Sequence, residues 1–142
     1  MANKYFIKLS VLKVVLCFCI MFFLGCATYK DQQQLDTFEK TTDSYELAIR
    51  WGYFEMAYKF IKTKNNEKQE PTFKKFDDIK VTSYEVQRIN ISENKQSVRQ
   101  RVEIQYYKIN QLIQKTLIDS QSWEYDVIEQ KWYLHSGLPD FR

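Results

Sequence analysis

The side chains with the best case for acid–base chemistry are Asp119 and His135. General acid–base catalysis needs a proton-holding group within hydrogen-bond reach of a substrate. His135 is the single histidine and follows the last short apolar run, so we expect it on the surface at a strand end. Asp119 alternates with Leu117 and Gln121 in a strand-like pattern. If their shared face is enclosed, burial raises the pKa of the Asp119 carboxyl.

A simpler interpretation of Asp119 involves Lys115, which stands on the same predicted face. A solvent-exposed ion pair between the two side chains explains the acid without any catalysis. We expect this arrangement, and the sequence assigns no catalytic residue.

Thiol and metal chemistry have no support in the residue types. All three cysteines, Cys17, Cys19 and Cys26, lie at or before residue 26, and one histidine leaves only carboxylates as further metal ligands. The sequence also lacks a Gly-rich phosphate loop, a G-x-S-x-G turn and a Cys–His pairing. We therefore expect neither a metal site nor a cofactor.

The N-terminal residues have the layout of a secretory signal. Residues 1–13 carry lysines but no acid, and residues 14–24 form an uncharged run that ends in Gly25-Cys26. The apolar stretch 14–27 is shorter than the about 20 residues that cross a bilayer core of ~30 Å as a helix. This stretch is therefore predicted as a signal rather than a membrane span.

Phe23-Leu24-Gly25-Cys26 resembles the lipobox of bacterial lipoproteins. In that family the cysteine receives a diacylglycerol thioether, the chain is cut before it, and the new amine is acylated. Gly25 and Cys26 match the pattern, whereas Phe23 stands where an aliphatic residue is usual. The resemblance implies that residues 1–25 are a signal peptide and that Cys26 carries a lipid anchor; several acyl chains hold firmly where one is marginal. The alternative is an ordinary cleaved signal with an incidental thiol.

Ala27, rather than Asp, follows the lipobox cysteine. Within that family this residue implies sorting to the outer membrane, on its periplasmic face. The membrane is thus the first expected partner, through the lipid on Cys26.

The formal charge of +3 comes from 21 Lys+Arg against 18 Asp+Glu. Residues 1–25 hold three of the lysines and no acid, which leaves residues 26–142 with 18 charges of each sign. A balanced mature chain argues against nucleic acid as a partner.

Residues 26–34 are polar and are predicted as a tether, followed by a single domain over 35–142. Apolar steps of three and four from Leu35 onwards predict one or two helices, and Gly52 predicts a break before a further helix over 54–61. Residues 63–76 are predicted as a loop. The lysine-rich stretch Lys62–Lys75 is predicted to be solvated, and contact with anionic lipid or cell-wall polymer is the alternative.

Beyond residue 79 the apolar period changes to two. This alternation predicts strands over 79–91, 98–106 and about 112–125, and a fourth that begins at 132. The phase slips near Thr82–Ser83 and near Gln87–Arg88, which predicts two bulges that bend the sheet. The expected fold class is α+β, with N-terminal helices packed on a strongly bent, cone-like antiparallel sheet of about four strands.

This arrangement resembles the nuclear transport factor 2-like, or cystatin-like cone, fold over residues 35–142. The resemblance rests on element order, on the kink in Arg50-Trp51-Gly52-Tyr53-Phe54, and on the closing Trp123 and Trp132 with Leu138-Pro139. It implies a curved sheet wrapped around helices to form a pocket. Members include ketosteroid isomerases, scytalone dehydratase and polyketide cyclases, and many others only bind or dimerise, so the fold does not select a function.

Six residues are candidates for a pocket or interface on the sheet. They are Tyr106, Leu117, Asp119, Gln121, Trp123 and Trp132. Aromatic side chains are enriched in ligand pockets and protein interfaces, and they are also ordinary core residues. Arg99 and Arg101 share a strand face with Glu103 and Gln105, which predicts either a polar docking surface or cross-strand ion pairs.

Three functions are compatible with these patterns. The first is a lipid-anchored periplasmic module without catalysis, which binds a protein partner or forms a homodimer in the cell envelope. The second is a pocket that binds a small molecule or lipid, favoured by a large dry pocket lined by Tyr106, Leu117 and Trp123. The third is an enzyme that uses Asp119 as its base.

Overall fold

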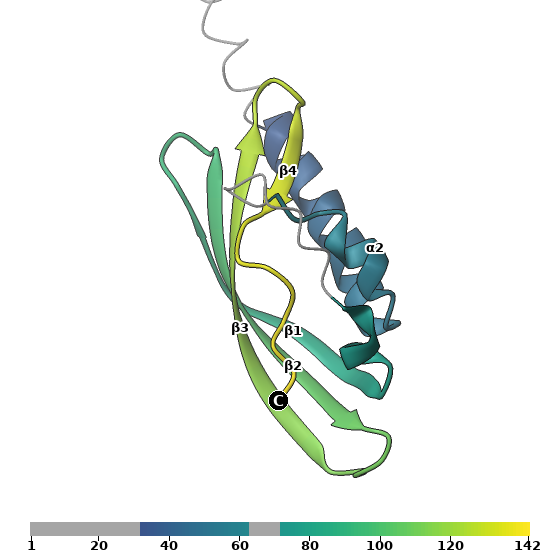
Figure 1. Ribbon diagram of the computed structural model, residues 1–142. Coiled ribbons are helices and arrows are strands. Elements are labelled where there is room, and N and C mark those ends of the chain that lie inside the picture. Colours follow the sequence, from purple (N-terminus) through teal and green to yellow (C-terminus); the bar gives the residue numbers. More distant parts are fainter. Residues whose placement is uncertain (1–31, 63–71) are drawn as a thin grey trace, which may run out of the picture. The chain divides into compact units, whose positions relative to one another are not determined.

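The computed structural model describes residues 32–62 and 72–142. Residues 1–31, which include the predicted signal peptide and the predicted lipobox with Cys26, and residues 63–71 lie outside the described residues. The chain divides into two units, 1–36 and 37–142, and the packing below is that of the second. The elements in chain order are a long helix over 32–50, α2 (Phe54–Tyr58), the 3-10 helix η1 (Phe73–Phe76), β1 (Ile79–Ile91), β2 (Ser97–Lys108), β3 (Gln114–Asp126) and β4 (Lys131–Leu134) (Figure 1).

The four strands form one antiparallel sheet in the order β1-β2-β3-β4. Consecutive strands are neighbours, as short connections require. A helix packs on this sheet, so the predicted α+β class and the four-stranded antiparallel meander are confirmed. The strand ranges also agree with the alternation of the sequence to within a few residues.

Both predicted bulges are present in β1. Its register against β2 shifts between Val81 and Ser83 and again between Val86 and Arg88. Thr82 and Gln87 are therefore extra residues without a cross-strand partner. Because each extra residue restores the phase, one row of apolar side chains stays on the same face as buried Ile104 and Val102 of β2: Ile79, Val81, Tyr84, Val86, Ile89 and Ile91. We call this the inner face of the sheet.

The long helix is continuous over 32–50 and ends where the sequence predicts a break. Gly52 has a φ of +75° and its N–H donates to the Ile49 carbonyl at 3.1 Å, while the Tyr53 N–H donates to the Ala48 carbonyl at 2.8 Å. These two bonds form a Schellman motif, which favours glycine at the left-handed position. Of the one or two helices predicted before Gly52, the structure has one.

Three details of the secondary structure differ from the predicted elements. Residues 32–34, assigned to the tether, are helical, η1 lies inside the stretch predicted as loop, and α2 ends at Tyr58 rather than at residue 61. Phe76 explains the second case, because its buried ring stacks on Phe54 with 4.4 Å between centroids. One buried apolar side chain of this kind can order a segment whose lysines suggest a solvated loop.

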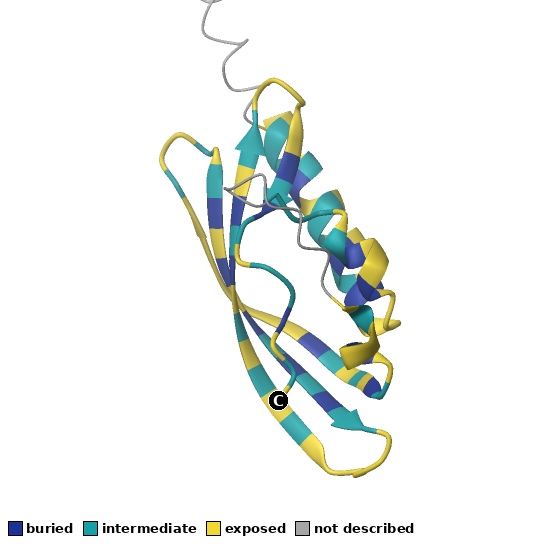
Figure 2. Ribbon diagram, viewed as in Figure 1, coloured by how far each residue is buried: buried dark blue, intermediate teal, exposed yellow. Residues whose placement is uncertain are grey.

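The core lies between the long helix and one half of the inner face. The Tyr45 ring packs edge-on against Trp123 at 5.4 Å, and Phe38 packs against Trp132 at 4.9 Å. Buried aromatic side chains of this size remove about 150–250 Å² each from water. Figure 2 shows the buried residues on the helix and on the strands that face it.

Residues 138–142 cover the other half of the inner face. Phe141 packs against Tyr106 at 4.9 Å and against Phe54 at 5.6 Å. The Tyr106 hydroxyl and the Lys115 ammonium both donate to the Arg142 carbonyl, at 2.6 and 3.0 Å. This segment lies in front of the sheet in Figure 1.

The two edges of the sheet differ. At β4, the Leu134 N–H donates to the Phe60 carbonyl at 2.8 Å, and the Lys62 N–H donates to the Leu134 carbonyl at 3.1 Å. The Lys62 ammonium also bonds Asp126 at 2.7 Å and Glu129 at 2.8 Å, which ties this segment to the β3–β4 turn. The β4 edge is thereby covered, whereas no described segment pairs with the outer side of β1.

Candidate functional site

The six sheet residues singled out from the sequence do lie on the inner face, but most of them are sealed. Trp123, Trp132, Gln121 and Tyr106 are 0%, 2%, 2% and 3% exposed. Leu117 and Asp119 are half-buried. The two tryptophans are core residues rather than an interface or a pocket mouth, because the long helix covers them.

Gln121 is the centre of a buried hydrogen-bond network. Its Nε2 donates to Asp119 Oδ2 at 2.7 Å and to the Tyr84 hydroxyl at 2.9 Å. Its Oε1 accepts from Gln100 Nε2 at 2.6 Å and from Trp123 Nε1 at 3.1 Å. Two donors and two acceptor positions are the full capacity of an amide side chain. Gln121 is therefore a saturated structural group with no bond left for a ligand.

Asp119 does not form the exposed pair with Lys115 that the sequence favoured. Lys115 instead donates to the Arg142 carbonyl, and Asp119 accepts from Gln121. Burial raises the pKa of the Asp119 carboxyl above its ordinary value, and the Gln121 hydrogen bond opposes this rise. The carboxyl is thus held in the dry environment that the catalytic hypothesis requires.

Two buried polar atoms have no hydrogen-bond partner in the described part of the chain. One is the hydroxyl of Tyr45, whose pKa is raised by burial first and then by the charge of Asp119. The other is Nδ1 of His135, whose side chain is only 15% exposed and whose Nε2 lies 3.6 Å from a Glu124 oxygen. The prediction of an exposed His135 is wrong, because the residue after β4 still packs against β3.

Tyr106 and Leu117 line a surface hollow of about 410 Å³ beside residues 138–142, with Thr116, Ile118, Asp140 and Arg142. Trp123 does not reach it, and Asp119 does not line it. The large pocket shared by Tyr106, Leu117 and Trp123, which would have favoured a ligand inside the cone, is replaced here by packed side chains.

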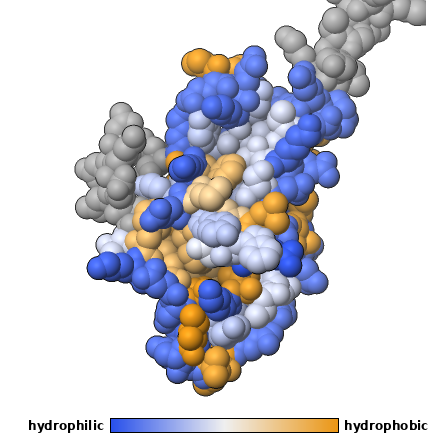
Figure 3. All heavy atoms as spheres, turned by 90° about the vertical axis from the view of Figure 1, so that its right-hand side faces the viewer, coloured by the Kyte–Doolittle hydropathy of each residue, from blue (hydrophilic) through white to orange (hydrophobic). Residues whose placement is uncertain are grey.

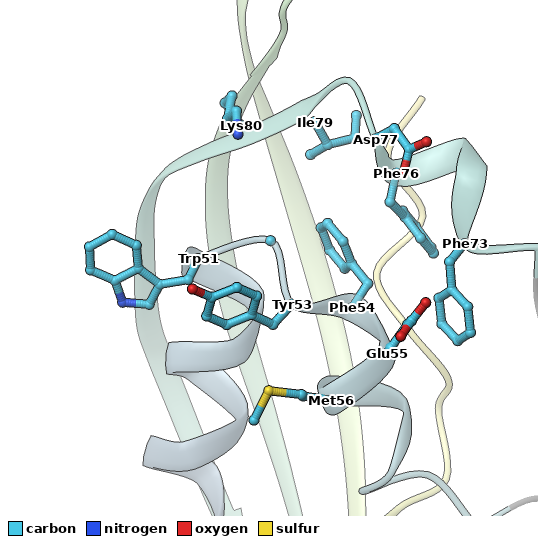
Figure 4. A pocket seen from close by; sticks show the side chains of 11 residues that line it. Trp51, Tyr53, Phe54, Glu55, Met56, Phe73, Phe76, Asp77, Ile79 and Lys80 are labelled. Atoms are coloured by element: carbon cyan, nitrogen blue, oxygen red, sulfur yellow. The ribbon is translucent and has the colours of Figure 1, made fainter.

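A different hollow opens where the long helix ends. It has a volume of about 540 Å³, and we call it the helix-turn hollow. Its lining residues come from the helix turn, α2, η1 and the start of β1: Trp51, Gly52, Tyr53, Phe54, Glu55, Met56, Phe73, Phe76, Asp77, Ile79 and Lys80. Figure 4 shows Trp51, Tyr53 and Met56 on one side and the Phe54, Phe76 and Phe73 rings on the other.

The helix-turn hollow has unusually exposed large side chains. Trp51, Tyr53 and Met56 are 70%, 57% and 55% exposed, and Leu47, one helical turn before Trp51, is 53% exposed. The Schellman turn at Gly52 directs the chain so that the residues on either side of it face solvent. Figure 3 looks onto this side of the molecule, where apolar residues form a patch bordered by hydrophilic ones. Clustered exposed apolar surface of this kind is typical of interaction sites.

The sequence contained a signal for this site. The kink Arg50–Phe54 is part of the resemblance stated above, but its aromatic residues were not chosen as site residues. Trp51 and Tyr53 stand on either side of Gly52, which ends the helix. No further helical turn follows that could cover their rings. That local rule identifies the exposed pair without any tertiary information.

Ionisable groups at the helix-turn hollow are two acids and one base. Glu55 and Asp77 line it together with Lys80, so its formal charge is negative. Nowhere in 32–62 or 72–142 do three or more His, Cys, Asp or Glu side chains gather in a way that suits a metal ion. The described helices are also too short or too polar for any of them to cross a bilayer.

The chain matches no model of a known protein family, no curated protein and no solved structure. Arguments about function therefore rest on its own residues.

Proposed function

We propose that the protein is a lipid-anchored module of the bacterial cell envelope that binds a protein partner through the helix-turn hollow. Cys26 carries the lipid after removal of residues 1–25, on the periplasmic face of the outer membrane. The support for the anchor is the basic, apolar and small-residue order of residues 1–26, with Gly25 directly before Cys26.

We also propose that residues 35–142 form a nuclear transport factor 2-like domain in which the sheet bends around the helices. Support comes from the element order and from the two bulges at Thr82 and Gln87, since a bulge bends its strand and increases the twist.

Partner binding rests on one observation, the exposure of Trp51, Tyr53 and Met56 around a hollow. Tryptophan and tyrosine dominate the residues that contribute most to protein binding, because they bury large apolar area while ordering few rotatable bonds. The Glu55 and Asp77 carboxylates at the same hollow favour a partner segment that places a basic side chain beside an apolar one.

A small-molecule ligand is the second candidate. The volume of about 540 Å³ lies within the range of about 300–1,000 Å³ that ligand pockets have. The wide exposure of Trp51 favours a protein, since a small ligand gains most where its surroundings enclose it. Asp119 lines none of the hollows described above, which leaves the enzyme hypothesis without a substrate position.

The anchor is tested by mass spectrometry of membrane-fractionated protein, with Cys26→Ser beside the wild type. We expect the wild type to start at residue 26 with the mass of the acyl groups, and the variant to leave the membrane fraction unmodified. A soluble, unmodified wild type would refute the lipid anchor while leaving the hollow untested.

Partner binding is tested with a photo-cross-linking residue in place of Met56. Cross-linked protein is expected in envelope fractions and is expected to disappear when Trp51→Ala and Tyr53→Ala are added. The matched control places the same probe at Ile128, which is 95% exposed on the β3–β4 turn away from the hollow. Equal cross-linking from both positions would reject the hollow as a specific site.

A further inference from the structure

Within residues 32–62 and 72–142, β1 is an unpaired edge strand with exposed apolar residues. It has 13 residues and ends the sheet on the side opposite β4. Val86, Ile89 and Ile91 belong to the inner face, yet they are 43%, 50% and 49% exposed. Unpaired edge strands are templates for pairing with another strand, and proteins usually shield long apolar ones.

The outer face of the β1–β2 pair carries like charges opposite each other. Glu85 lies opposite Glu103, and Arg88 lies opposite Arg101. Such pairs destabilise a sheet. Glu103 accepts hydrogen bonds from two glutamines, but within residues 32–62 and 72–142 no ion pair reaches Glu85 or Arg88. The cross-strand ion pairs predicted as one explanation for Arg99 and Arg101 are thus absent there, and the β2 residue directly opposite each of these two β1 charges carries the same sign.

We propose that β1 pairs antiparallel with β1 of a second copy of this chain, about a two-fold axis at Val86. Positions along β1 are counted by their partners on β2, so the bulge residues Thr82 and Gln87, which have no partner, are left out of the count. Counted in this way, Glu85 and Arg88 each lie one position from Val86, on opposite sides of it. The next pairs outward from Val86 are Tyr84 with Ile89, Ser83 with Asn90, and Val81 with Ile91. A two-fold axis brings each residue opposite the other member of its pair.

Charge and hydrophobicity are then complementary on both faces. Glu85 meets Arg88 of the second copy, so each row across the junction reads Glu103, Glu85, Arg88, Arg101. On the inner face, Val86 meets its own equivalent, and Tyr84 covers half-exposed Ile89 of the second copy.

The bulge at Gln87 makes this pairing possible. In a regular strand, residues three apart point to opposite faces, and Glu85 could not lie opposite Arg88 of a second copy. The extra residue places both side chains on the outer face, as their opposition to Glu103 and Arg101 shows. The bulge therefore does not shield the edge but sets the register of self-pairing.

This self-association goes beyond the proposed partner binding and does not depend on it. No residue of the helix-turn hollow except Ile79 and Lys80 belongs to β1, and those two lie outside the paired segment 81–91. The two surfaces can be disabled separately.

The test uses the full chain in detergent micelles, labelled with a donor or an acceptor fluorophore, with energy transfer and sedimentation as readouts. We expect a wild-type dimer. Glu85→Arg and Arg88→Glu, made separately, should each weaken self-association about tenfold or more, because in a dimer of two identical variants the reversed side chain faces a like charge on the other copy. An equimolar mixture of the two variants should recover wild-type affinity, since one strand then presents two arginines and the other strand presents two glutamates.

Folding and association respond in opposite directions, which separates them. Each single reversal replaces a like-charge pair with β2 by an opposite one, so the melting temperature of the monomer should rise slightly while the dimer weakens. Arg99→Glu, an equal charge change on the outer face of β2, should leave the dimer intact.

Three results would overturn self-pairing: a monomeric wild type across the concentration range, single reversals that dimerise normally, or a mixture that fails to recover. Trp51→Ala and Cys26→Ser should keep the energy transfer, so a failed anchor or hollow is told apart from a failed β1 interface.

Discussion

The inner face of the sheet and the helix-turn hollow are both rich in aromatic residues, but they differ in what covers them. Trp123 is 0% exposed beneath the long helix, whereas Trp51 is 70% exposed one residue before Gly52. The polar atoms follow the same division. Gln121 uses every bond it can make inside the sheet, while the hollow has charged groups at an open surface.

The difference teaches that aromatic content alone does not indicate function. On the inner face the rings provide stability, and a ligand would have to displace the long helix or residues 138–142. At the helix-turn hollow Phe54 and Phe76 are packed, but the Trp51 and Tyr53 rings are mostly exposed, so selection for folding does not explain those two. Substitutions in the two regions test this division.

Trp123→Ala should have the largest effect on stability. Removing a fully buried ring that contacts Phe38 and Tyr45 is expected to cost about 3–5 kcal/mol of unfolding free energy. Urea denaturation of the two variants measures the contrast, because Trp51→Ala should change the free energy by no more than about 0.5 kcal/mol. Equal losses would mean that the two regions do not differ as described.

Gly52→Ala should come next, with a loss of about 1 kcal/mol. The added Cβ has room, with its nearest neighbour at 3.9 Å, so the cost comes from the positive φ. Gly52→Asn is the control, because asparagine adopts the left-handed conformation more readily than alanine. If alanine and asparagine cost the same in thermal denaturation, backbone strain is not the cause.

Asp119→Asn should stabilise the protein at neutral pH by about 1 kcal/mol, because asparagine keeps an acceptor for Gln121 without a buried charge. Burial raises the folded pKa of Asp119 above its ordinary 3.8, so the unfolded state releases this proton first. Wild-type stability therefore falls as pH rises from about 3.8 through the folded pKa, and the loss is complete above it.

Denaturation midpoints of the wild type and of Asp119→Asn, measured across a range of pH, test the predicted direction of the pH dependence of stability. The advantage of the variant should vanish below pH 3.8, where both forms of the residue are neutral. A constant difference at all pH values would show that the charge of Asp119 is not responsible.

Tyr45→Phe should have the smallest effect, a change of a few tenths of a kcal/mol in either direction. Its hydroxyl is buried without a hydrogen bond in the described residues, so its removal breaks no bond. Tyr84→Phe is the matched control, since it removes the acceptor of Gln121 Nε2 and should cost about 1 kcal/mol. The two midpoints together report whether the network ends at Tyr84.

Local patterns in the sequence located the strands, the bulges and the helix break, but not η1. The two phase slips located both bulges, and Gly52 located the helix break, because side-chain period and backbone conformation depend on neighbouring residues. Local patterns did not predict contacts between residues far apart in the sequence. The partner of Lys115 is the Arg142 carbonyl rather than Asp119, and His135 is mostly buried, since residues 138–142 and β3 lie against them.

By itself the sequence determined the helix followed by four antiparallel strands, and it showed which strand residues share a face. Only the tertiary structure decided which faces are covered: Trp123 by the long helix, Tyr106 by Phe141, and Ile89 by nothing in the described chain. The physical reason is that burial is a property of two surfaces. The periodicity of a strand predicts which of its side chains share one surface. The second surface belongs to a segment far along the chain, and no local pattern specifies where that segment packs.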